Sequence, residues 1–166
     1  MESGGGDREK DEVSGMRFFD TNVLVYAASS QDPRKSAIAC ELIQHALEVN
    51  HDGVISCQVM TEFVNVMQSR FKVPASEIDE WVSQFYPLLA TEVTMDAVRN
   101  ALYIKEEYGI QYYDALIVAT AEKLHCHEII SEALSVKMCK YCIFLSVKMC
   151  KFAVVLSVKM WYHILR

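Results

Sequence analysis

The sequence predicts an α/β fold with a mainly parallel sheet. Short apolar runs of three or four residues alternate with longer segments of helical periodicity between residues 16 and 132. This alternation is typical of strand–helix repeats, which bring successive strands parallel to one another. At 166 residues, 52% of them apolar, the chain suits one domain with an adequate core.

The first half of the predicted domain contains two strands. Residues 16–19 read as a buried strand that continues into a short helix or turn over 23–28. Asp32 before Pro33 is typical of a helix start, and an apolar face then runs to about residue 50. Residues 54–56 form the second expected strand, and apolar spacing predicts a helix over 58–71.

The second half repeats the pattern. Ser76 and Asp79 resemble a capping box for a helix that runs to about Leu89, and residues 92–94 form the third expected strand. Gly109 is placed as the C-cap of a helix over 95–108. A further helix over 112–124 and a fourth strand over 128–131 complete the domain.

The charge of the chain is unevenly spread. The formal charge is −6, but residues 133–166 contain six basic residues and no acid, so the remainder carries −12. A negatively charged domain argues against broad electrostatic binding of nucleic acid, although not against binding that a metal ion mediates.

Six cysteines occur in the chain, and residues 1–15 lack the apolar stretch of a secretory signal, so we expect reduced thiols and a cytoplasmic location. Cys139 and Cys142 have C-x-x-C spacing, with His125, Cys126 and His127 upstream. A second such pair is missing from the sequence, which disfavours a zinc site. No apolar run approaches the ~20 residues of a membrane-spanning helix.

Three acids stand out against this background. Glu62 shares a helical face with Val59 and Val66, and Asp114 has apolar neighbours at the same spacings. Asp20 directly follows the first strand. Because a buried carboxylate is costly unless it is paired or binds metal, the three predict a site for a divalent cation such as Mg²⁺ or Mn²⁺.

We expect Asp20 at a strand end and Glu62 and Asp114 in the first turns of their helices, so the topology brings these acids together. Sites in parallel sheets form outside the carboxyl ends of the strands. Thr21 and Asn22 follow Asp20 and are candidates to hydrogen-bond a carboxylate or a substrate phosphate; stabilisation of the turn is an equally good interpretation. Ser56 and Gln58 are interpreted as structural residues of the next strand-to-helix turn.

The segments around the acids resemble the three motifs of PIN-domain nucleases, especially VapC-like toxins. Residues 18–26, 56–63 and 112–121 are similar to these motifs, and they occur in the family's order and spacing. The resemblance implies an α/β/α sandwich that cleaves single-stranded RNA with Mg²⁺ or Mn²⁺. It also implies a homodimer and an antitoxin partner. It assigns Asp20, Glu62 and Asp114 as catalytic residues and metal ligands.

The chain departs from the family's pattern at a fourth acidic position. Ala133 stands where the family usually has Asp, and the neighbouring Glu132 is a further candidate metal ligand. A catalytically impaired PIN domain that acts as a protein-binding module is therefore the alternative function. A DNA-directed nuclease is a third interpretation, which the lack of a large DNA-binding extension disfavours.

These observations divide the chain into a disordered tail over 1–15, a PIN-like nuclease domain over 16–132 and a divergent tail over 133–166. The divergent tail contains three 11-residue repeats, 134–144, 145–155 and 156–166, that begin with the same Leu-Ser-Val-Lys-Met. We interpret the repeats as a recently duplicated or out-of-frame coding segment.

Overall fold

The structure is a computed structural model that describes residues 15–131. The predictions for residues 1–14, for Glu132 and Ala133, and for the three repeats lie outside the described residues. Within the described part, no helix is both long enough and apolar enough to cross a membrane.

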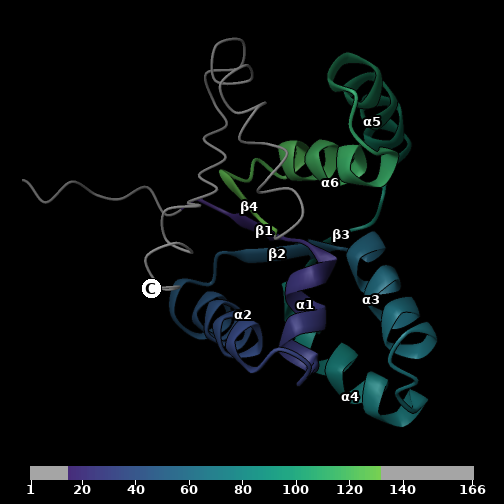
Figure 1. The fold of residues 1–166 in the computed structure, drawn as a ribbon. Coiled ribbons are helices and arrows are strands. Elements are labelled where there is room, and N and C mark those ends of the chain that lie inside the picture. The colour runs from purple at the N-terminus through teal and green to yellow at the C-terminus, as the bar shows by residue number, and fades with distance from the viewer. Residues whose placement is uncertain (1–14, 132–166) are drawn as a thin grey trace, which may run out of the picture.

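A parallel sheet forms the centre of the described domain (Figure 1). Its strands are β1 (Arg17–Phe19), β2 (Gly53–Ser56), β3 (Leu89–Thr91) and β4 (Glu128–Ile130). Their spatial order is β3-β2-β1-β4, and each neighbouring pair is parallel. The prediction of an α/β fold with a mainly parallel sheet is confirmed.

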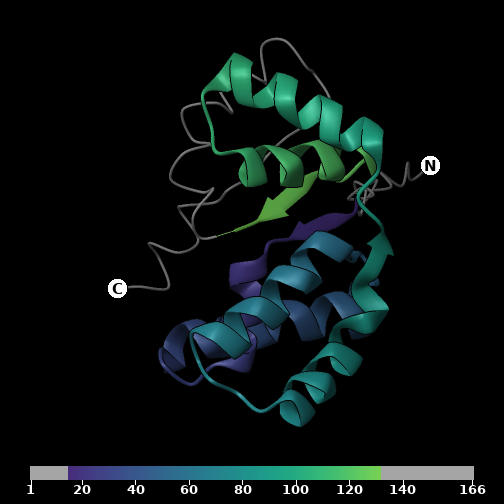
Figure 2. The ribbon, with the colours of Figure 1, turned by 90° about the vertical axis from the view of Figure 1, so that its right-hand side faces the viewer.

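Helices cover both faces of this sheet and make three layers (Figures 1 and 2). Helices α5 and α6 lie on one face, and the other four lie on the opposite face. The helices are α1 (Thr21–Ala28), α2 (Pro33–His45), α3 (Cys57–Ser69), α4 (Ala75–Phe85), α5 (Met95–Tyr108) and α6 (Tyr112–Lys123).

The main core fills the space between the sheet and helices α1 to α4. Phe18, Phe19, Leu24, Ile55 and Phe63 are fully buried there. A smaller apolar cluster joins α5 to α6. The sheet and its helices therefore form a rigid support for whatever residues project from the strand ends.

Several helix ends follow the sequence signals. The Asp32 side chain accepts a hydrogen bond from the backbone N–H of Lys35, 3.1 Å away, and Pro33 begins α2. Gly109 has φ 64°, a left-handed conformation that glycine adopts without steric cost, and it ends α5 as predicted.

Two details of the second half differ from prediction. The third strand is Leu89–Thr91, not 92–94, because Thr94 is used as the N-cap of α5 and accepts from the N–H of Ala97. The expected capping box of Ser76 and Asp79 is wrong as well. Helix α4 begins at Ala75 after Pro74, which has no side chain that can cap it.

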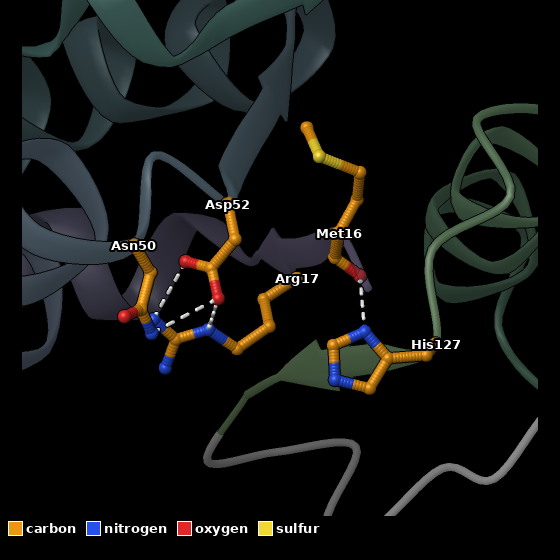
Figure 3. Close-up of polar contacts among 5 residues, drawn as sticks. All are labelled: Met16, Arg17, Asn50, Asp52 and His127. Atoms are coloured by element: carbon orange, nitrogen blue, oxygen red, sulfur yellow. Dashed lines mark hydrogen bonds and ion pairs between the residues drawn. The ribbon is translucent and has the colours of Figure 1, made fainter. Parts of the chain in front are cut away.

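An ion pair joins the amino ends of β1 and β2 (Figure 3). Arg17 donates to both carboxylate oxygens of Asp52, at 3.0 and 2.8 Å, and Asn50 donates to one of them. Beside this pair, the backbone N–H of His127 donates to the carbonyl oxygen of Met16, and ring nitrogen Nδ1 of His127 lies 2.8 Å from the same oxygen (Figure 3), so β4 is tied to β1. These contacts fasten the end of the sheet opposite to the strand ends that carry the acids.

Candidate active site

The candidate site lies at the carboxyl edge of the sheet. Strand β1 pairs with β2 on one side and with β4 on the other, because the chain runs outward from β1 through β2 to β3 and then crosses back to place β4 on the far side of β1. Such a reversal opens a crevice outside the strand ends, where ligands bind in sheets of this kind. Asp20 and Ser131 directly follow β1 and β4, and Ser56 is the last residue of β2.

Asp20 is held firmly at this edge. Its backbone N–H donates to the carbonyl oxygen of Ile130 in β4, and its side chain caps α1. Carboxylate oxygen Oδ1 accepts from the backbone N–H of Thr21 at 2.6 Å. Oxygen Oδ2 accepts from Asn22 Nδ2 at 2.8 Å and from the Ser131 hydroxyl at 2.5 Å. Only 7% of Asp20 is exposed, so these bonds fix the position of its carboxylate.

The surroundings of Asp20 raise the pKa of its carboxyl group. Burial is the largest cause, because it disfavours the charged form. The hydrogen bonds from Ser131 and from the Thr21 backbone lower this pKa, whereas the charges of Glu62 and Asp114 raise it. Both of the other carboxylates predicted from the sequence therefore act electrostatically on Asp20.

Glu62 reaches the site from α3, but its environment differs from prediction. The side chain is exposed, not part of the core face, because the buried stripe of α3 consists of Val59, Phe63 and Met67. Glu62 lies beside that stripe, where its Oε2 accepts from the Thr21 hydroxyl at 3.0 Å. It is also in the second turn of α3, not the first.

Asp114 is the third residue of α6 and lies in its first turn, as predicted. It is partly buried. The positive end of the helix dipole favours a negative charge at this position. Asp114 thus approaches Asp20 from the layer opposite to the one that contains Glu62.

The donor set suits a hard divalent cation. In the part of the chain that the structure describes, no three His, Cys, Asp or Glu side chains lie close enough to enclose an ion. Mg²⁺, however, is usually held by one or two carboxylates and keeps several of its waters. Carboxylates that raise the pKa of a buried neighbour, as Glu62 and Asp114 do, are a fitting environment for a cation that offsets their repulsion.

Ser131 is the residue that sequence reasoning missed. Its hydroxyl also accepts from Asn22 Nδ2 at 3.1 Å, so Asn22, Asp20 and Ser131 form a closed triangle of hydrogen bonds. A serine directly after a predicted strand was the available signal, but the pairing of β4 with β1 was needed to interpret it. Thr21 and Asn22 both contact carboxylates; their contact with a substrate stays a prediction.

Comparison with known proteins gives a consistent picture. Residues 17–132 match the family model of the PIN domain. The fold is similar to the crystal structure of VapC20 of Mycobacterium tuberculosis, a toxin that cleaves the sarcin–ricin loop, with a TM-score of 0.53 and 17% sequence identity. The match covers 70% of this chain and 88% of that one. No curated protein matches the sequence.

Proposed function

This chain belongs to the PIN domain family, and from that premise we propose that it is a metal-dependent endoribonuclease that cleaves single-stranded RNA. PIN domains are generally nucleases, so hydrolysis of a phosphodiester is the reaction to be expected. The observation that carries the proposal is the buried Asp20 carboxylate, whose pKa is raised in part by the charges of Glu62 and Asp114.

Asp20, Asp114 and Glu62 are the residues that would hold Mg²⁺ or Mn²⁺, with Glu132 as a further candidate. The bound cation would supply charge stabilisation to the scissile phosphate and acidify a coordinated water. Asp20 provides a fixed oxygen at the end of β1, because Asn22 and Ser131 prevent its carboxylate from turning.

Glu62 has a second role in this proposal, besides holding the cation. Its exposed carboxylate is open to solvent, and the Thr21 hydroxyl holds one of its oxygens, Oε2. A carboxylate held in this way is able to orient the attacking water and accept a proton from it. Thr21 thereby links the cation-binding group to the proton-accepting group through one short segment of α1.

A toxin role, with an antitoxin partner, a homodimer and a cytoplasmic location, belongs to the same proposal. VapC20 is a toxin that acts on RNA, and the fold of the present chain is similar to it. Its reported target, the sarcin–ricin loop, gives a first RNA to test.

The test is cleavage of single-stranded RNA by the full chain with Mg²⁺, with Mn²⁺ and with EDTA. We expect cleavage with either cation alone, and a loss of at least about a hundredfold for Asp20→Asn. The matched control is Asp96→Asn, the same change at an exposed acid in the first turn of α5. Cleavage that survives EDTA, or an Asp20→Asn chain as active as the control, would contradict the proposal.

The second candidate is a catalytically impaired PIN domain that binds a protein partner. Ala133 in place of the family's fourth acid favours it, as does the absence of a preformed three-ligand cluster among residues 15–131. Addition of Mn²⁺ to the folded chain distinguishes the two candidate functions. A nuclease should melt at a higher temperature with Mn²⁺, since a ligand that binds only the folded state stabilises it. A chain with no such shift and no cleavage is the impaired form.

A further inference from the structure

The Gln58 side chain is anomalous in the described domain. Its Nε2 and Oε1 are buried, and neither has a hydrogen-bond partner in the part of the chain that the structure describes. Leaving a buried donor and a buried acceptor unpaired costs free energy, and native proteins rarely retain such groups. Gln58 was interpreted from the sequence as a structural residue, but a structural role would normally use its amide.

Gln58 lies next to the candidate active site. It is the second residue of α3, directly after the turn that Ser56 makes from the end of β2. Glu62 is four residues further on, about 6 Å along the helix axis, on the same side of the helix. Because Glu62 contacts Thr21 beside Asp20, Gln58 lies one helical turn from a residue of the candidate site.

The structural tasks near Gln58 are done by other groups. The Ser56 hydroxyl caps α3 by accepting from the N–H of Val59. Gln44 and Glu48 have the same four-residue spacing as Gln58 and Glu62, and they form a hydrogen bond of 2.9 Å. Glu62 is available to Gln58 as an equivalent partner, but the two side chains form no hydrogen bond. Its amide therefore neither holds the turn nor positions Glu62.

We propose that Gln58 is a specificity-determining residue whose carboxamide hydrogen-bonds the edge of a nucleobase of single-stranded RNA beside the scissile bond. The proposal rests on the proposed nuclease function. A carboxamide offers a donor next to an acceptor, and adenine presents the complementary pair. A phosphate offers acceptors alone and would leave Oε1 unpaired. Bases of single-stranded RNA are splayed out and are read along these edges.

The net charge of the chain favours recognition of a base by a neutral side chain such as that of Gln58. The net charge is −6, so RNA gains little from long-range attraction and depends on short-range contacts. The amide of Gln58 adds no charge beside the three acids. To reach a base, the side chain must turn outward, and this movement breaks no hydrogen bond within the described domain.

The test compares Gln58→Met, which keeps the length of the side chain and removes its hydrogen bonding, with Gln68→Met. Gln68 is exposed on the same helix and serves as the matched control. The substrates are oligoribonucleotides that differ in a single base next to the scissile bond. We expect kcat/KM of Gln58→Met to fall about tenfold on the preferred base and to change little on the others. We also expect an equal or higher melting temperature, because an unpaired buried amide has been removed.

Two results would overturn the proposal. An unchanged base preference would show that Gln58 reads no base, and a lowered melting temperature would show that its amide is bonded within the fold. If the original chain cleaves no RNA, the nuclease function fails and Gln58 is tested separately by affinity. Asp20→Asn chains with and without Gln58→Met are then titrated with the same oligoribonucleotides. A base-dependent loss of affinity would support the role of Gln58, and equal affinities would end it.

Discussion

Removal of the Ser131 hydroxyl tests whether the hydrogen-bond triangle holds Asp20. Ser131→Ala deletes the 2.5 Å bond to Oδ2 of a carboxylate that is 7% exposed. Bonds to charged groups contribute about 1.5–3 kcal/mol, and the Asn22 bond to the same oxygen remains. We therefore expect the free energy of unfolding at pH 7 to fall by about 2 kcal/mol. For a domain of this size the melting temperature should drop by about 6–8 °C.

The pH dependence of this loss has a definite sign. The Ser131 bond lowers the pKa of Asp20, so the variant has a folded-state pKa further above the ordinary value of 3.8 than the original chain has. The bond favours the ionised form, so its loss lowers the free energy of unfolding by the full amount only where Asp20 is ionised. The difference in stability should therefore be complete above the folded-state pKa values and should shrink as the pH falls through them.

Melting curves of both chains across a pH series, without added metal, measure this difference. Ser131→Thr is the matched control, because it restores a hydroxyl at the same position. Equal melting temperatures for the original chain and Ser131→Ala at pH 7 would refute the reasoning. A deficit that persists unchanged in acid would show that the serine supports packing, not the Asp20 charge.

Three further predictions concern other charges. Asp52→Asn should lower the free energy of unfolding by about 3 kcal/mol, since it leaves Arg17, whose side chain is 13% exposed, without its partner; urea unfolding would show no change if the pair were dispensable. Burial raises the pKa of Glu128 above 4.5, so stability of the original chain should fall as the pH rises from 4.5 through that raised pKa. Glu128→Gln should abolish this fall and melt higher at pH 7, and a lower melting temperature would contradict it. Ala133→Asp should increase the stabilisation by Mn²⁺, and an unchanged Mn²⁺-induced shift would mean that position 133 is not the family's fourth acid.

The local sequence was sufficient to predict the fold class and the position of Asp20. Alternating periodicities located each strand to within a few residues, and caps such as Asp32 and Gly109 marked helix ends through local chemistry. The third strand was misplaced because β-branched Val93 and Thr94 have high strand propensity. The capping bond of Thr94 overrode that propensity.

The environments of the site residues were harder to predict. Val59 and Val66 suggested a buried face that includes Glu62, whereas packing chose Val59, Phe63 and Met67 and left Glu62 at its border. Helical spacing predicts the direction in which a side chain points, but it does not predict how far the neighbouring layer extends to cover that side chain. Ser131 depended on a contact across 111 residues, which local patterns do not contain.

The hydrogen bonds of Asp20 divide its two oxygens between different tasks. A carboxylate oxygen has two lone pairs, and Oδ2 already accepts from both Asn22 and Ser131. Among residues 15–131, Oδ1 accepts only from the Thr21 backbone, so it is the oxygen with capacity for a further partner. Under the proposed function, the cation would therefore bind Asp20 through Oδ1, beside the start of α1.

The residue that supplies the Oδ1 bond, Thr21, also supplies the hydroxyl that holds Glu62. Any shift of Thr21 would then disturb the metal ligand and the proton acceptor together, which makes the first turn of α1 the segment on which the geometry of the site depends.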